Sequence, residues 1–216
     1  MLAIAPLFAR CLAIIAIFVG FSLPAQAERE SYYAPPTQVL AGILLGYSDA
    51  FNQDYINLNQ NPMARFTSAT AGFHFNRDKN AISNFRASIT AGSITSPDKD
   101  YTWILISQSG LDISQYEEIV VFSTQAVPFD KDSKATIDGF MTLRGITAPV
   151  KIEAKLNYIQ DTNILSGSVL GEKAAIGLSL AVNFRCGEFG MSPVDNNGKS
   201  RGDVASLKLE MRAIKQ

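Results

Sequence analysis

Hydrophobic and polar residues alternate with a period of two along much of this chain. In Val150–Tyr158 every even-numbered residue is apolar or aromatic and every odd-numbered residue is polar. The same alternation runs through residues 136–144, where only Phe140 falls on the polar side, and through residues 174–184 and 204–213. Because successive side chains of a β-strand point to opposite faces, each segment predicts a strand with one apolar and one polar face.

Weaker strand patterns cover residues 39–47, 65–76, 84–91, 118–126 and 163–170. Residues 28–38, with Pro35 and Pro36, are predicted to be irregular. A short helix is predicted near residues 100–116, where the alternation is lost. Short connections favour antiparallel neighbours, so the pattern predicts a single all-β domain of about eight antiparallel strands.

Strands with one apolar face have to bury it, either between two stacked sheets or inside a closed barrel. A barrel of about eight strands encloses either packed side chains or one small ligand. The alternation by itself does not distinguish a filled core, which is the more common case, from a ligand-binding interior.

The N-terminus has the features of a signal peptide. Arg10 precedes a largely apolar run of 13 residues, Cys11–Leu23, and Ala25-Gln26-Ala27 fits a signal-peptidase site. This run is shorter than the roughly 20 residues that a membrane-spanning helix needs. We therefore expect cleavage after Ala27, which leaves residues 28–216 as the folded domain.

Composition narrows the possible functions. The chain has 19 Lys and Arg against 20 Asp and Glu, which argues against a nucleic-acid-binding protein with a basic surface. One His and two Cys nearly exclude a zinc site built from these residues. His74 lies between two phenylalanines with no nucleophile motif nearby. Loss of Cys11 would leave Cys186 without an intramolecular partner, so Cys186 is expected to be an apolar filler, with a reactive thiol or a bond to a second molecule as the alternatives. We expect no catalytic residue, no metal site and no cofactor.

Two segments resemble the YceI-like family. Gly139–Val150 reads Gly-Phe-Met-Thr-Leu-Arg-Gly-Ile-Thr-Ala-Pro-Val and is similar to the family signature G-x-L-T-h-x-G-h-T-x-P-V. Arg185–Gly190 is similar to a second family segment, with Gly202-Asp203-Val204 opening the last strand. The resemblance covers residues 65–213.

This resemblance implies a lipocalin-like antiparallel β-barrel in the bacterial periplasm that binds an isoprenoid lipid, either a polyprenyl chain or the tail of a quinone. Arg185 is expected either to hold the ligand's head group or to tie strand ends to a carboxylate. The apolar residues predicted to line the interior are Val121, Met141, Leu143, Ile152, Leu156, Ile176, Leu178, Leu180, Leu207, Leu209 and Met211.

Two other functions are compatible with the sequence. The first is a filled barrel that binds an envelope or inner-membrane protein through the segments 96–116 and 187–203. The second is an enzyme acting on a lipid or an oxidant, for which the polar candidates are His74, Cys186 and Glu188. The sequence leaves the oligomeric state open, a dimer included.

Overall fold

The computed structural model describes residues 29–45, 47–48, 54–55, 64–161, 173–194, 198 and 202–216. The predicted signal peptide and the predicted strand at residues 163–170 lie outside these residues. Within them, no helix is long and apolar enough to cross a membrane.

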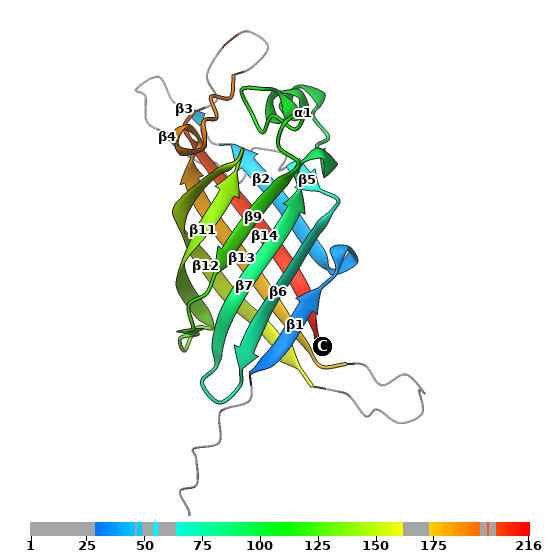
Figure 1. Ribbon diagram of the computed structural model, residues 1–216, viewed down its shortest axis with the longest axis vertical. Helices are drawn as coiled ribbons and strands as arrows, with labels where there is room; N and C mark the ends of the chain where they lie inside the picture. Colours follow the sequence, from blue (N-terminus) through cyan, green and yellow to red (C-terminus); the bar gives the residue numbers. More distant parts are fainter. Residues whose placement is uncertain are drawn as a thin grey trace, which may run out of the picture.

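Eight antiparallel strands form a closed barrel (Figure 1), which confirms the predicted fold. The barrel closes because the first strand pairs with the last, Tyr33 opposite Ile214. In spatial order the strands are β1 (Glu30–Ala34), β6 (Ala69–Asn76), β7 (Ala81–Thr90), β9 (Glu118–Ser123), β11 (Lys134–Leu143), β12 (Ile146–Gln160), β13 (Ala175–Arg185) and β14 (Val204–Lys215).

The prediction that residues 28–38 are irregular is wrong for Glu30–Ala34. This segment is β1, which pairs with β6 on one side and with the end of β14 on the other. The 3-10 turn Pro36–Gln38 then leads into β2 (Val39–Leu45), which continues along β14. Five residues give too short an alternation to recognise, and the partners of β1 are distant in sequence.

Short elements complete the chain. β2 pairs with β5 (Ala64–Phe66), which pairs with β8 (Ile94–Thr95), and β10 (Val127–Pro128) pairs with β7. The segment 65–76, predicted as one strand, is therefore divided between β5 and β6. The remaining elements are β3 (Tyr47–Ser48), β4 (Asp54–Tyr55) and the 3-10 turns η2 (Ala91–Ser93) and η3 (Cys186–Phe189).

The predicted helix is present as α1, Lys99–Ile106, at the end of the barrel that we call the upper end (Figure 1). The Asp98 carboxylate caps it, accepting hydrogen bonds from the Asp100 and Tyr101 amides at 2.9 and 3.2 Å. Arg144 fixes the segment after the helix, since its guanidinium donates to the carbonyls of Gln108 and Gly110 at 2.5 and 2.6 Å.

The opposite, lower end carries the β6–β7 turn and the C-terminus, and there Glu30 joins three parts of the chain. Its carboxylate accepts hydrogen bonds from the Tyr32 hydroxyl (2.6 Å), Arg77 Nε (2.9 Å) and Lys215 Nζ (2.7 Å). Burial by itself raises the pKa of Glu30, but these hydrogen bonds and the charge of Arg77 outweigh it and lower the pKa to about 2. Burial and the bond to Glu30 raise the pKa of Tyr32.

The predicted apolar faces point into the barrel, with one exception. Tyr158 was expected beside Leu156 on the apolar face of β12, but the strand has a bulge between these residues. Tyr158 therefore lies opposite Gly177 and is 44% exposed. The bulge reverses the direction of the side chains beyond it, which a count by twos along the sequence does not reveal.

Candidate ligand-binding interior

The inward faces of the strands form one continuous apolar interior. In the described residues the buried polar or charged side chains are Ser83, Asp112, Ser123 and Ser206. The Ser123 hydroxyl lies where β9 separates from β11, and it donates a hydrogen bond to the Asp138 carbonyl at 2.7 Å. The walls between the two ends thus present almost only hydrocarbon.

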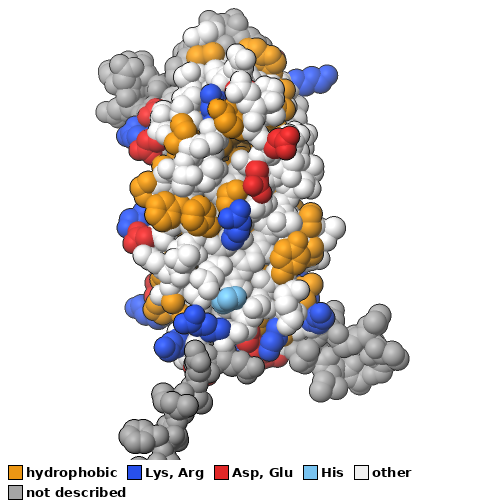
Figure 2. Space-filling model, viewed as in Figure 1, with side chains coloured by type: hydrophobic (Ala, Val, Ile, Leu, Met, Phe, Trp, Pro, Cys, Tyr) orange, Lys and Arg blue, Asp and Glu red, His pale blue; other side chains and the backbone are white. Residues whose placement is uncertain are grey.

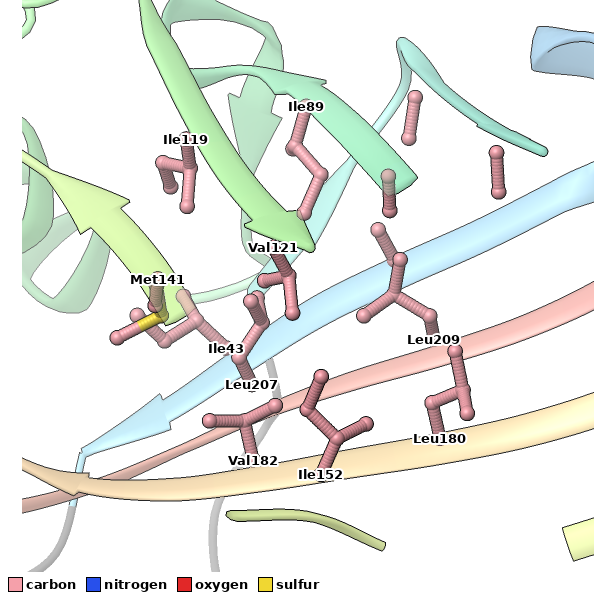
Figure 3. Packing of buried hydrophobic residues seen from close by; sticks show 14 of the residues in the cluster. Ile43, Ile89, Ile119, Val121, Met141, Ile152, Leu180, Val182, Leu207 and Leu209 are labelled. Carbon is pink, nitrogen blue, oxygen red and sulfur yellow. The ribbon is translucent and has the colours of Figure 1, made fainter. Parts of the chain in front are cut away.

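Large aliphatic side chains lie side by side on the wall formed by β2, β14, β13 and β12. Leu207 is in register with Ile43 on one neighbouring strand and with Val182 on the other, and Val182 faces Ile152 on the next strand. In Figure 3 this wall points toward the aliphatic side chains of β7 and β9, among them Val121.

A band of alanines runs across another part of the wall. Ala34 on β1 is in register with Ala71 on β6, and Ala71 is in register with Ala87 on β7. All three side chains are buried. Three neighbouring strands therefore carry the shortest apolar side chain at one level, so this part of the wall projects least into the barrel.

Aromatic rings gather toward the lower end. Tyr32 stacks on Phe73 with 5.6 Å between ring centroids and meets Phe75 edge-on at 6.5 Å. Phe75 in turn lies 6.5 Å from Phe129. These buried rings fill the interior below the alanine band.

Helix α1 and η3 cover the upper end. Tyr101 points inward, and its hydroxyl accepts a hydrogen bond from the Leu45 amide at 2.8 Å. Phe189 of η3 is fully buried and packs edge-on against Phe184 at 5.4 Å. This end is closed by side chains from short elements, whereas long strands form the walls.

All the apolar residues that the sequence predicted for the interior are buried, the most exposed being Leu156 at 8%. Arg185 does not line the interior. Its side chain is 60% exposed and forms an ion pair with Asp203 at 3.2 Å. Asp203 also accepts a hydrogen bond from the Gly187 amide at 2.7 Å. Of the two roles expected for Arg185, this position matches the link between strand ends.

The glycines of the strands allow close approach and do not widen the interior. A Cβ at Gly177 would lie 2.2 Å from the Tyr158 ring, which covers it. A Cβ at Gly139 would lie 2.6 Å from the side chain of Ile152 and 2.7 Å from the Phe122 carbonyl. Ala154, another small residue of these strands, is buried.

The polar candidates for catalysis do not converge. His74 lies on β6, where its Nδ1 is 3.1 Å from the Asn84 amide nitrogen. Cys186 is buried, whereas Glu188 is exposed on η3. Among the side chains that the structure describes, no group of three or more His, Cys, Asp or Glu could hold a metal ion.

The outer wall carries a hollow of about 510 Å³ where β9 separates from β11. Phe122 and Phe140 stack beside it with 5.6 Å between ring centroids. Phe140 is 47% exposed, which agrees with its predicted place on the polar face. This hollow lies on the outside and is separate from the apolar interior.

Sequence reasoning missed the part of the interior that β1, β6 and β7 contribute. The alanine band and the aromatic rings belong to β1, β6 and β7, whose alternation is short or interrupted by a bulge between Gly72 and His74. Phe73 and Phe75 alternate with His74 and therefore share one face of β6. This alternation is the sequence signal that could have identified both rings as interior residues.

Known proteins support the same fold. The family model for the YceI-like domain matches residues 48–213. BcnA of Burkholderia cenocepacia has 14% sequence identity and a TM-score of 0.60, and the match covers 83% of this chain and 98% of that one. The YceI protein of Campylobacter jejuni has 15% identity and a TM-score of 0.59, with 78% and 93% of the two chains covered.

Among curated proteins, none matches this sequence. YceI-like proteins are generally binding proteins with a lipocalin-like barrel, and polyisoprenoid binding is known for the family. Because the family model spans most of the chain and the closed eight-stranded barrel agrees with it, this protein belongs to the YceI-like family.

Proposed function

We propose that this protein binds an isoprenoid lipid, a polyprenyl chain or the tail of a quinone, in the interior of its barrel and carries it without chemical change. The observation that carries the proposal is the continuous apolar interior of a YceI-like barrel. An isoprenoid tail is long, flexible and purely hydrocarbon, and the walls that would surround it are hydrocarbon too.

Hydrophobic burial supplies the affinity in this proposal. Each methylene of the tail removed from water contributes about 0.8 kcal/mol, and no directional contact is needed along the tail. Ser123, a polar side chain of the interior wall, is already hydrogen-bonded to Asp138, so it does not have to be paired by the ligand.

The alanine band is the place in the wall where we expect the tail to lie. Side chains at Ala34, Ala71 and Ala87 end at Cβ, whereas leucines and isoleucines project from the opposite wall. A hydrocarbon chain running along the band would replace the methylene groups that larger residues would supply in a fully packed core.

The proposal includes a periplasmic location, reached through the N-terminal signal peptide with cleavage after Ala27. Such a location suits a lipid carrier, because an isoprenoid chain released from a membrane needs an apolar container to cross an aqueous compartment. The exported protein would begin at Glu28.

The test is to purify the exported protein from its native host, measure its intact mass and extract it with organic solvent for mass spectrometry. We expect an N-terminus at Glu28 and an isoprenoid in the extract. Column fractions without the protein serve as the control for free lipid. An extract without isoprenoid, together with no uptake of polyprenol or quinone in vitro, would overturn the proposal.

A further inference from the structure

One continuous segment, residues 98–116, lies across the upper end of the barrel, and we call it the lid. It comprises α1 and the turns that follow, and it connects β8 to β9 (Figure 1). Its side chains Ile104, Leu105 and Leu111 are at most 1% exposed and belong to the apolar interior. On the outer side Trp103 is 49% exposed, and hydrophobic side chains are exposed at this end on the face shown in Figure 2. The lid therefore closes the interior with apolar side chains that no strand supplies.

Hydrogen bonds within the lid hold it together. Asp98 caps the start of α1, and the Ser107 amide donates to the Trp103 carbonyl at 3.1 Å at its end. After the helix, the Leu111 amide donates to the Leu105 carbonyl at 2.6 Å. Because these partners all lie inside the segment, the lid can move as a unit without losing its own structure.

Polar contacts join the lid to the barrel at three consecutive carbonyls. Those of Gln108 and Gly110 accept the hydrogen bonds from Arg144 described above. The carbonyl between them, that of Ser109, accepts a hydrogen bond from the Ser192 amide at 2.8 Å. Arg144 lies in the turn between β11 and β12, and Ser192 follows η3. Since both donors come from turns, these bonds can break while the strands stay paired.

The lid begins and ends in irregular chain. Residues 96–97 lead into it from β8, and residues 116–117 lead from it into β9. The Ala91 amide donates to the Glu117 carbonyl at 2.8 Å and so fixes the chain just beyond the lid. Hinges are a few loop residues or element ends that absorb changes in φ and ψ, and both ends of the lid are of this kind.

An entrance through the walls would require strands to separate. β12, β13 and β14 are paired along most of their length. The shortest pairing between neighbouring long strands joins β9 to β11 through three residue pairs, and there the Ser123 hydroxyl bonds to the Asp138 carbonyl across the gap. The upper end needs only the contacts of the lid to break, so it is the easier entrance to the interior.

We propose that the lid opens to admit the isoprenoid and that Arg144 controls this opening by holding the lid closed. The inference rests on the proposed function, because it concerns how the same interior receives its ligand. Opening moves Ile104, Leu105 and Leu111 away from the barrel and uncovers the apolar walls. Closure afterwards shields the bound tail from water.

Loss of the guanidinium should speed both entry and release. Arg144→Met keeps a long side chain but loses both bonds to the lid. We expect the rates of uptake and release of undecaprenol or ubiquinone to rise on the order of tenfold, since hydrogen bonds from a charged group contribute about that factor. The dissociation constant should change by less than about threefold, because both rates rise together.

The matched control is Lys151→Met, which removes an exposed cation paired with Asp138 on the outer wall and should change the rates by less than about twofold. Melting temperatures of both variants check that they are folded. Rates in folded Arg144→Met equal to those of the wild type would refute the control of opening by Arg144.

A reversible disulfide tests the opening in the other direction. Ser109→Cys with Ser192→Cys places thiols on two main chains that are already hydrogen-bonded, which suits a disulfide. In the oxidised protein we expect uptake to fall at least about tenfold and to recover with dithiothreitol. The control is Thr142→Cys with Thr147→Cys, directly opposite on β11 and β12 with hydroxyls 2.8 Å apart, which should leave uptake within about twofold. Wild-type uptake by the oxidised lid variant would overturn the proposal and indicate entry through the wall.

Hydrogen exchange measures opening of the lid without any ligand. We expect the amides of α1 to exchange on the order of tenfold faster in Arg144→Met than in the wild type, with those of β13 and β14 unchanged. Equal protection of α1 in the two proteins would contradict the role of Arg144. A wild type that takes up neither undecaprenol nor ubiquinone would contradict the proposed function, whereas the exchange rates test the lid by themselves.

Discussion

At the scale of single residues, neighbouring side chains of a strand lie in opposite environments, one inside the barrel and the next on its outer wall. Leu178 is fully buried in register with Leu156 and Met211, whereas its neighbour Ser179 faces outward opposite Glu210. Such adjacent positions give matched pairs of variants that separate effects on the interior from effects on the strand.

We predict that Leu178→Arg abolishes lipid uptake and destabilises the fold by about 3–5 kcal/mol, because it buries a charge without a partner. Ser179→Arg, next to it on the outer wall, should change the stability by less than about 1 kcal/mol. Urea unfolding and uptake of a labelled isoprenoid measure the two effects. Normal uptake by a folded Leu178→Arg protein would remove Leu178 from the lining.

The alanine band gives a sharper test of where the ligand lies. Ala87→Phe inserts a ring between Ala71 and Val121, and we expect loss of lipid uptake with a destabilisation below about 1 kcal/mol if the tail occupies that space. In a fully packed interior the same change should lower the free energy of unfolding by about 1–3 kcal/mol, because the ring would overpack the core. Ala181→Phe on the outer face of β13 is the control. Retained uptake by Ala87→Phe would show that the tail lies elsewhere.

At the scale of elements, the barrel depends on how its ends are tied together. β1 has only five residues, yet it pairs with β6 and β14 and thereby closes the ring. Glu30 reinforces this closure, since its carboxylate binds Arg77 beside the β6–β7 turn and Lys215 at the end of β14. At the other end Arg144 holds the segment after α1 in a comparable way.

The lowered pKa of Glu30 makes this closure pH-dependent. Its pKa is lowered from 4.5 to about 2 in the folded protein, so its contribution is complete above pH 4.5 and is lost as the pH falls toward 2. We expect the contribution to be on the order of 1–3 kcal/mol. Urea unfolding across this pH range should show a shallower loss of stability for Glu30→Gln than for the wild type. Glu153→Gln, an exposed carboxylate on β12, is the control, and equal pH dependence of Glu30→Gln and wild type would refute the role of Glu30.

At the scale of the whole molecule, the eight strands close into a barrel around one interior. The apolar side chains of the strands form one continuous interior between the two ends of the barrel. Closure of the sheet leaves the long strands without free edges, so contacts with partners fall to the ends and the outer wall.

The sequence by itself determined the all-β class, the family and one wall of the interior. Alternation with period two is a local property, and it is unambiguous in long strands such as β13 and β14, where Leu178, Leu180, Leu207 and Leu209 were correctly placed inside. The spacing of Gly139–Val150 that resembles the family signature is likewise local to one hairpin, β11–β12.

Only the tertiary structure decided which distant segments meet. The alanine band requires β1, β6 and β7 to align in register, and a single alanine in a short strand has no pattern of its own. The reversal at Tyr158 depends on a bulge against β13, and the pairing of Arg185 with Asp203 joins two segments that are distant in sequence. The cluster around Glu30 likewise joins residues far apart in sequence, Arg77 and Lys215. Local periodicity indicates which face of a strand is apolar. Closure of the barrel decides which distant residues that face meets and what it encloses.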